Sequence, residues 1–377
     1  MKKIPVFHPS ISIADVFSVA SALCKGNISG TSKNVEIFEN KFSKLVGRKH
    51  GVAVSNGSVA LDLAFAALDL SKDDEVILPA FTIISCLSSI IRTGAKPVFV
   101  DVDINTWNMK VEDVSQLISS RTKAVLIVHT YGLVVNAPEI ERLCQEKGII
   151  LIEDAAEAHG LEISNRACGS FGEISTFSFY ANKHVTTGEG GMILVNNSDL
   201  LMRLRDMRNL GFLPNQRFVH NHYYWNYRLS ALQASLGISQ INSLKKRIKK
   251  KKVQANFYRE LLQDFTELFQ LPLAEAHGTE NSYWVFGIVI KKAGIRDLVM
   301  SELLSEGIET RPFFWPLNEQ PVYLQNHSKE KITKCKNSEL LGRNGLYLPL
   351  GRHLKKYDQR KIVESLILSV KKFSGGI

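Results

Sequence analysis

Short apolar runs alternate with amphipathic stretches through the first two thirds of the chain. The runs at 124–129 and 149–153 are almost wholly apolar, which is typical of strands buried on both faces. A helical pattern between them, at 137–147, carries Pro138 in its first turn, where proline is well tolerated. Strands that alternate with helices predict an α/β fold with a mostly parallel central sheet. We expect its strands at 52–55, 75–78, 97–102, 124–129, 149–153, 173–179 and 192–195, with Pro79 ending the second.

The order of the elements changes after about residue 245. The later elements are a long basic helix, a strand at 282–290, a helix at 295–306, a short strand at 346–349 and a closing helix at 357–373. A chain of 377 residues is long enough to form two hydrophobic cores. We therefore predict a large α/β domain at residues 1–245 and a smaller C-terminal α+β domain at residues 246–377.

Composition favours a cytoplasmic protein that does not insert into a membrane. No run of about 18 apolar residues is present, so no transmembrane helix is expected. The start, Met1 to Pro5, has two lysines but no long apolar region after them, which argues against a secretory signal. The five cysteines are scattered and form no C-x-x-C pair, as in a reducing compartment. Because His220 and His222 also lack a nearby acid, we expect no metal site.

Seven of the positive charges behind the net charge of +10 lie between residues 245 and 252. Such a cluster could bind nucleic acid, or it could be the solvated face of a helix. Ile241, Leu244, Ile248 and Val253 are spaced as one buried stripe of a helix requires. No aromatic residues interleave with the lysines, so the solvated helix is the favoured interpretation and no nucleic-acid partner is expected.

The segment 55–61, SNGSVAL, follows an expected strand and begins an expected helix. The start of a helix has unpaired N–H groups and a partial positive charge, so it can hold a phosphate group. Gly57 would let the backbone approach such a group, and Ser58 would add a hydroxyl donor. Alternatively, Ser58 merely caps the helix, as serines commonly do.

The segment 151–160, LIEDAAEAHG, places Asp154 and Glu157 just after another apolar strand. Ligands of open α/β sheets bind at this edge, beyond the carboxyl ends of the strands. A carboxylate at that place can keep a ring nitrogen protonated and so make the ring an electron sink. From the local sequence, this role of Asp154 and the capping of the next helix are equally well supported.

The segment 175–192 runs from a strand into a polar turn that carries Ser178 and Lys183, and then into another strand. Most lysines are solvated, but this one lies between two apolar strands, about thirty residues after the acid at the strand end. A partly desolvated lysine has a lowered pKa and can form a Schiff base. Lys183 is therefore the predicted reactive lysine.

Together these segments resemble the pyridoxal-phosphate-dependent sugar aminotransferases of the DegT type. That family has the aspartate-aminotransferase-like fold, fold type I of the enzymes that use pyridoxal 5'-phosphate (PLP). The order and spacing of the similar segments extend over nearly the whole chain and are highly specific. The segments are 55–61, EVILPAFT at 75–82, PVFVDVD at 97–103, IEDAAEAHG at 152–160, 169–191, NYR at 226–228 and IETRPFFWP at 308–316.

The resemblance implies a role for each residue near the cofactor ring. Lys183 corresponds to the lysine that forms a Schiff base with PLP, and Asp154 to the partner of the pyridine nitrogen. Glu157, where many members have glutamine, corresponds to the residue near the ring hydroxyl. Phe81 corresponds to the aromatic residue that stacks on the ring.

The resemblance also implies a phosphate cradle and a shared active site. Gly57, Ser58 and Ser178 correspond to the residues that hold the cofactor phosphate. Asn226 corresponds to a residue that reaches the cofactor phosphate of the neighbouring subunit. We therefore expect a homodimer with shared active sites.

The expected substrates are a nucleotide sugar and L-glutamate, the usual amino donor of the family. Arg311 and Phe313 lie in the stretch that corresponds to the nucleotide-sugar site, although the rings of this stretch could equally serve packing. His184 replaces a smaller residue of the family beside Lys183, and we expect it at the substrate. Segments 152–160, 178–191 and 308–314 are most similar to members that aminate C4 of GDP-4-keto-6-deoxymannose.

Other functions remain open on the same fold. A dTDP- or UDP-linked ketosugar could replace the GDP-linked one. Some relatives dehydrate the sugar at C3, but they carry histidine where this chain has Lys183. A regulator that binds nucleic acid through the basic run at 245–252 is a further alternative, and the intact pair of Asp154 and Lys183 argues against it.

Overall fold

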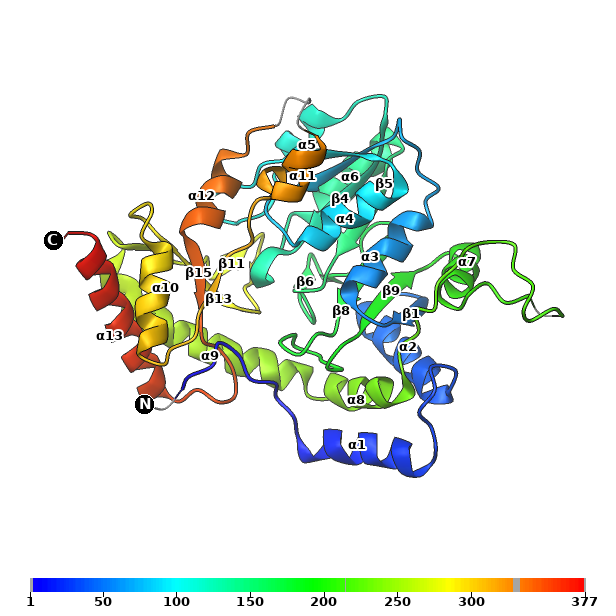
Figure 1. Cartoon of the computed structure of the whole chain (residues 1–377), viewed down its shortest axis with the longest axis horizontal. Helices are drawn as coiled ribbons and strands as arrows, with labels where there is room; N and C mark the ends of the chain where they lie inside the picture. Colours follow the sequence, from blue (N-terminus) through cyan, green and yellow to red (C-terminus); the bar gives the residue numbers. More distant parts are fainter. Residues whose placement is uncertain (1–2, 214, 328–332, 376–377) are drawn as a thin grey trace.

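A seven-stranded sheet forms the centre of the computed structural model, which describes residues 3–213, 215–327 and 333–375 (Figure 1). In spatial order its strands are β1 (His50–Val54), β9 (Gly191–Val195), β8 (Ile174–Ser178), β5 (Ile150–Asp154), β4 (Thr122–Val128), β2 (Glu75–Pro79) and β3 (Lys96–Val100). β9 is antiparallel to both of its neighbours, and the other pairings are parallel. The predicted mostly parallel sheet of an α/β fold is thus confirmed.

Helices cover both faces of this sheet because side chains alternate between the faces along each strand. In β4, Leu126 contributes to the core under α3 and α4, whereas Val125 and Ile127 contribute to the core under α2, α5, α6 and α8. The helices of this part are α1 (Ile13–Cys24), α2 (Lys33–Val46), α3 (Gly57–Ala66), α4 (Ile84–Thr93), α5 (Val111–Leu117), α6 (Ala137–Lys147), α7 (Ser198–Arg208) and α8 (Ala231–Ile241).

The seven expected strands of the central sheet all form, with ends within two residues of the predicted ones. Pro79 is the last residue of β2 rather than the residue after it. The strand expected at 282–290 is shorter and begins only at Phe286. Tyr283 has a φ of 48°, and this left-handed conformation interrupts the extended backbone.

A four-stranded antiparallel sheet organises the C-terminal part of the chain. Its spatial order is β10 (Phe269–Gln270), β13 (Phe286–Ile290), β15 (Gly345–Leu348) and β14 (Arg311–Pro312). Ile4 packs in the core of this part and pairs with Ile308, so the start of the chain also contributes to it. The helices of this part are α10 (Arg296–Ser305), α11 (Pro321–Asn326), α12 (Lys336–Asn344) and α13 (Lys356–Phe373). Two short two-stranded sheets pair β11 (Glu275–Ala276) with β12 (Thr279–Glu280) and, in the central part, β6 (Glu162–Ile163) with β7 (Arg166–Ala167).

The long helix α9 (Leu244–Leu262) runs from the central part to the C-terminal part (Figure 1). Leu244 and Ile248 pack in the central core, while Tyr258 and Leu262 pack in the C-terminal core. Val253, expected in the buried stripe, is exposed, because its step of five residues departs from the helical period of 3.6. The domain division predicted at residue 245 would fall at the start of α9 and stays a prediction.

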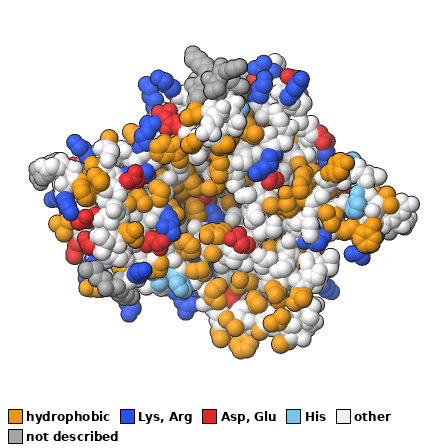
Figure 2. All heavy atoms as spheres, viewed as in Figure 1, with side chains coloured by type: hydrophobic (Ala, Val, Ile, Leu, Met, Phe, Trp, Pro, Cys, Tyr) orange, Lys and Arg blue, Asp and Glu red, His pale blue; other side chains and the backbone are white. Residues whose placement is uncertain are grey.

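An apolar surface lies over α1, which packs against α8 on the outside of the molecule (Figure 1). Ile13, Val16 and Phe17 are exposed there, and Figure 2 shows hydrophobic side chains gathered at this place, at the bottom of the view. Within the described ranges, no helix combines the length and the apolar character needed to cross a membrane.

Candidate active site

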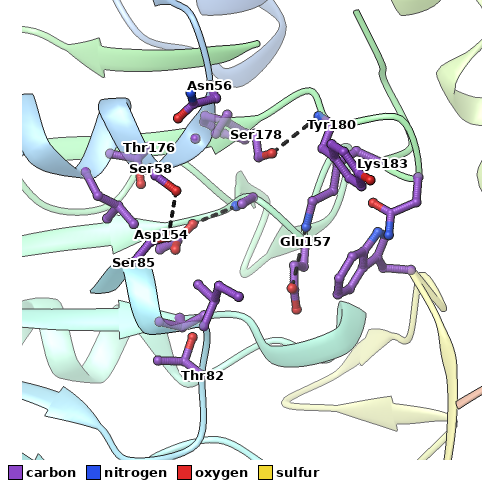
Figure 3. Close-up of a pocket in the computed structure, with 18 of the residues that line it drawn as sticks. Asn56, Ser58, Thr82, Ser85, Asp154, Glu157, Thr176, Ser178, Tyr180 and Lys183 are labelled. Atoms are coloured by element: carbon purple, nitrogen blue, oxygen red, sulfur yellow. Dashed lines mark hydrogen bonds and ion pairs between the residues drawn. The ribbon is translucent and has the colours of Figure 1, made fainter. Parts of the chain in front are cut away.

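A cavity of about 490 Å³ opens at the carboxyl ends of β1, β2, β4, β5 and β8. Residues that follow these parallel strands meet at the edge where open α/β sheets bind ligands. The labelled side chains in Figure 3 converge on this cavity from separate strand ends. The residues of the predicted cofactor site that line it are Gly57, Ser58, Asp154, Glu157, Ser178 and Lys183.

The helix that follows β1 presents an anion site to the cavity. Asn56 is the N-cap of α3, and its side chain accepts the N–H of Val59 at 2.9 Å. The N–H groups of Gly57 and Ser58 have no acceptor within the helix, and the helix dipole adds a partial positive charge there. Since Asn56 is the cap, the hydroxyl of Ser58 is left to face Ser85, with 2.6 Å between the two Oγ atoms (Figure 3). This arrangement suits a phosphate group.

Gly57 allows the start of α3 to approach Ser178 closely. A Cβ atom at position 57 would lie 2.7 Å from Ser178 Cβ, a contact that forces one of the two segments to shift. We expect Gly57→Ala to weaken the binding of PLP about tenfold, at the low end of the cost of overpacking. Titration of the cofactor-free protein with PLP, followed by absorbance, measures this effect. An unchanged dissociation constant would contradict the predicted phosphate cradle.

Asp154 ends β5 and is a buried acid at the floor of the cavity. Its Oδ1 accepts the N–H of Ala156 at 3.0 Å, and its Oδ2 accepts the thiol of Cys86 at 3.5 Å. Burial raises the pKa of Asp154, and the adjacent Thr176 Oγ1 has no hydrogen-bond partner among the described residues. No helix begins after Asp154, so the capping alternative is excluded. A protonated ring nitrogen would compensate this buried carboxylate.

Lys183 reaches the same cavity from the turn after β8 (Figure 3). Its Nζ lies 3.5 Å from Glu157 Oε1 and 3.5 Å from the centre of the Trp284 ring. Burial lowers the pKa of the Lys183 amine, against the opposing effect of the Glu157 and Asp154 carboxylates. The amine is therefore enclosed, partly desolvated and held near an acid, the conditions under which a lysine becomes a nucleophile.

Glu157 connects Lys183 to the C-terminal part of the chain. Burial raises the pKa of Glu157 to about 7, and its Oε2 accepts the N–H of Tyr131 at 2.7 Å. Tyr131 has a φ of 57°, which is uncommon for a residue other than glycine. Its hydroxyl accepts the N–H of Phe314 at 2.9 Å, and the two rings stack. Tyr131 thus joins the cavity acid to the segment that contains Arg311 and Phe314.

The predicted aromatic contacts of the site are arranged differently from the expectation. Phe81 is fully buried and packs on Tyr131, Phe313 and Phe314, so it does not line the cavity. Phe313 is buried as well, with its ring against Trp107. Phe314 is the ring of this cluster that lines the cavity. Stacking by Phe81 and substrate contact by Phe313 stay predictions that would require these rings to turn.

Three other predicted residues lie away from the main cavity. His184 is buried in a separate, small cavity of about 50 Å³ behind Lys183 and does not line the main cavity, so its expected contact with the substrate stays a prediction. Arg311 is exposed and paired with Glu309 at 2.6 Å. Asn226 is exposed and does not line the cavity of its own chain. That position is compatible with the predicted reach into a neighbouring subunit, which stays untested.

Local sequence patterns did not identify Trp284, Ser85 or Thr176, although all three line the cavity. Trp284 comes from the C-terminal part, and only the folded chain brings it to Lys183. Ser85 lies in the helix after β2, and its polar side chain among apolar residues was the one available signal. Thr176 is buried in β8 like the residues on either side of it, so the pattern of this strand did not indicate that it lines the cavity.

A buried cluster of His129, Glu153 and Cys168 is the one group of potential metal ligands in the described residues. His129 Nδ1 accepts the N–H of Val135, and His129 Nε2 lies 2.8 Å from Glu153 Oε1. The two carboxylate oxygens of Glu153 also accept the N–H groups of Gly169 and Phe171. These hydrogen bonds use both ring nitrogens of His129 and both carboxylate oxygens of Glu153, which are the atoms that could bind a metal. This is the pattern of a structural network.

The cavity combines a phosphate-binding helix start, a buried acid and an enclosed amine. A phosphorylated pyridine ring that carries a carbonyl group would use all three. Lys183 and His129 attract the buried carboxylate of Asp154, but neither forms an ion pair with it among the described residues, and the missing side chain of Gly57 lets the start of α3 lie close to Ser178. The residues present therefore fit PLP.

Comparison with known proteins agrees with this chemistry. The model of the DegT/DnrJ/EryC1/StrS aminotransferase family matches residues 11–367. A GDP-perosamine synthase of Vibrio cholerae is 37% identical over 92% of this chain and 93% of its own length. A UDP-N-acetyl-3-dehydro-alpha-D-glucosamine 3-aminotransferase of Acidithiobacillus ferrooxidans is 34% identical over 84% of this chain and 83% of its own length.

A solved structure gives the same result for the fold. The aminotransferase TlmJ from Streptoalloteichus hindustanus superposes with a TM-score of 0.90 and is 26% identical. The match covers 99% of this chain and 100% of that one. The similarity therefore includes both sheets and the helix that links them.

Proposed function

This chain belongs to the DegT/DnrJ/EryC1/StrS aminotransferase family, and we propose that it transfers an amino group from L-glutamate to C4 of a nucleotide-linked 4-keto-6-deoxy sugar. The family consists of PLP-dependent sugar aminotransferases, and this chain is an enzyme of that kind. The observation that carries the proposal is the enclosed amine of Lys183 in one cavity with Asp154 and the start of α3.

We assign the cofactor-binding roles to the residues that line the cavity. The N–H groups at Gly57 and Ser58, together with the Ser178 hydroxyl, would hold the phosphate. Asp154 would accept a hydrogen bond from the ring nitrogen and keep it protonated. When bound, PLP supplies an electron sink that stabilises negative charge on the carbon next to the transferred nitrogen.

Lys183 is the group that moves protons. As a base, its Nζ would take a proton from the amino-bearing carbon of the donor. As an acid, it would then give that proton to a carbon of the cofactor. Burial lowers the pKa of this amine, which favours its neutral, basic form. Glu157 lies 3.5 Å away, and burial raises its pKa to about 7. It can therefore exchange a proton with Lys183 near neutral pH.

We propose that the active enzyme is a homodimer with shared sites. The segment before Asn226 exposes Phe218, Val219 and Tyr223, and exposed apolar groups of this size usually mark a contact surface. Asn226 itself is exposed and could reach the phosphate site of a second copy. A second copy would also cover the exposed rings of Phe218 and Tyr223.

The substrate we favour is GDP-4-keto-6-deoxymannose, which would give GDP-perosamine. The 37% identity to a GDP-perosamine synthase supports it, while the relative that acts on a UDP-linked sugar keeps the nucleotide open. The purified enzyme should be incubated with L-glutamate and a panel of GDP-, dTDP- and UDP-linked 4-keto and 3-keto sugars. Mass spectrometry should show an amino sugar from the GDP-linked 4-ketosugar, and none when glutamate is omitted.

The other outcomes of the panel identify the alternatives. Amination of a dTDP- or UDP-linked sugar but not of the GDP-linked one would overturn the proposed nucleotide. A product that has lost the C3 oxygen and gained no nitrogen would indicate a dehydratase, although the histidine of such enzymes is replaced here by Lys183. DNA binding without any conversion would favour the regulator.

A further inference from the structure

The basic run of α9 divides into an exposed face and two inward side chains. Lys245, Lys246 and Lys249 are exposed, whereas Arg247 and Lys251, one helical turn apart, point toward the body of the protein. The proposed function uses none of these residues. The two inward cations both contact the surroundings of Lys183.

Lys251 holds the backbone of the residue whose ring covers Lys183. Its Nζ donates a hydrogen bond to the carbonyl oxygen of Trp284 at 2.7 Å. The Trp284 ring lies 3.5 Å from Lys183 Nζ and forms one wall of the main cavity, whereas Lys251 does not line that cavity. Burying a lysine is costly unless its ammonium group is hydrogen-bonded, so this contact accounts for its inward position.

Arg247 holds the other side of the same turn. Its Nη1 donates to the carbonyl oxygens of His184 at 3.1 Å and of Gln240 at 2.7 Å. Because His184 directly follows Lys183, this contact fixes the backbone from which the Lys183 side chain extends. Lys183 and Lys251 also line the small cavity of about 50 Å³ in which His184 lies.

We propose that Lys251 is a positioning residue that holds Trp284, and through its ring Lys183, in the orientation needed to react with the cofactor. Arg247 supports the same lysine from its backbone side. The inference rests on the proposed role of Lys183. It gives the linking helix α9 an indirect part in the chemistry of the main cavity, through Trp284 and the backbone of His184.

Stopped-flow mixing of cofactor-free protein with PLP tests this role. The visible absorbance of the lysine–cofactor bond reports its rate of formation in wild type, Lys251→Met, Lys251→Arg and the control Lys249→Met. Lys249 lies on the exposed face of the same helix, so its variant removes the same charge. We expect Lys251→Met to slow the reaction about tenfold, the low end of the effect of one lost hydrogen bond to a charged group, and arginine to restore most of the rate.

Steady-state kinetics and a double variant separate positioning from general stability. For Lys251→Met, kcat should fall while the KM values for both substrates stay unchanged. Trp284→Leu removes the ring but keeps the carbonyl group, and it should slow bond formation by a similar factor. Combining the two changes should then add little, because both act through one contact. Each variant's thermal unfolding is recorded, and Trp284→Leu keeps the test decisive if the methionine variant is unstable, since a wild-type rate in that variant would also overturn the inference.

Two results would overturn the inference. One is a rate for Lys251→Met equal to that of Lys249→Met. The other is a double variant in which the two effects simply multiply. Failure of the proposed function looks different, because a lysine–cofactor bond that still forms in Lys183→Ala would show that another lysine reacts.

Discussion

Replacing Lys183 with alanine is expected to abolish the visible absorbance of the lysine–cofactor bond and to reduce turnover by about 10³-fold or more. The amine is the group that bonds to the cofactor and then carries the proton, and loss of a general acid–base group alone costs roughly 10²–10⁴-fold. Lys183 is enclosed beside Glu157 and Trp284, and no other described lysine lines the main cavity.

Absorbance spectra of the purified protein with PLP, and turnover with the preferred sugar, measure the effect. Lys72→Ala is the matched control, since Lys72 is exposed in a turn away from the cavity. The fold should persist in both variants, because Lys72 is exposed and because Glu157, whose pKa burial raises to about 7, can take up a proton when it loses Lys183. Full activity of Lys183→Ala would end the assignment.

The same variant tests whether the sites are shared between subunits. Mixing Lys183→Ala with Asn226→Ala subunits creates one site per mixed dimer that has both Lys183 and the partner-derived Asn226. Random reassociation would then recover about a quarter of the wild-type activity, since half of the dimers are mixed and one of their two sites is intact. No recovery would argue that Asn226 acts within its own chain.

Lys183, Asp154 and Gly57 could be located from the sequence because each follows a recognisable apolar strand. Parallel strands bring their carboxyl ends to one edge of a sheet, so the three segments had to meet if the strands were correct. The boundary errors of up to two residues did not matter, since the functional side chains lie at the carboxyl ends of the strands or in the segments that follow them.

The walls of the cavity could not be located in this way. Trp284 reaches Lys183 from the C-terminal part, and Tyr131 depends on a left-handed backbone conformation that no local pattern indicated. The run at 313–315 showed that rings gather there, but the position of Phe314 at the cavity depends on its contacts with Phe81 and Tyr131. Such choices depend on contacts between distant segments.

The basic run of α9 shows a similar limit. Its periodicity indicated one buried stripe, and cations on a helix are usually solvated. That Arg247 and Lys251 turn inward became visible only with the carbonyl groups of His184 and Trp284 placed beside them. The favoured interpretation, a solvated helix face, holds for the outer lysines alone.

Replacing Asp154 with asparagine should reduce turnover by about 10³-fold while leaving the fold intact. The amide keeps the volume of the side chain and can still accept the N–H of Ala156, but it carries no charge to hold a ring nitrogen protonated. In a buried site this charge interaction is strong, so its loss falls mainly on the reaction. The bound cofactor should also show a changed absorbance spectrum.

Stability should respond to this change in opposite directions with and without PLP. Burial raises the pKa of Asp154 above its ordinary value, so the charged carboxylate destabilises the cofactor-free protein at neutral pH. Asparagine removes that cost, and the cofactor-free variant should unfold at an equal or higher temperature than wild type. This difference should disappear as the pH falls below the ordinary pKa of an aspartate, where the carboxyl is neutral in both the folded and unfolded states.

Addition of PLP should reverse the order, because the wild-type carboxylate gains a direct ion pair with the ring nitrogen, and tighter binding raises the unfolding temperature more. Calorimetry of wild type, Asp154→Asn and the exposed control Asp73→Asn, each with and without PLP, measures both effects. If Asp154→Asn gained as much stability from PLP as wild type and kept turnover within tenfold, the carboxylate would not be the partner of the ring. The electron sink would then depend on another group of the cavity, and Glu157, the other buried acid beside Lys183, would be the next to replace.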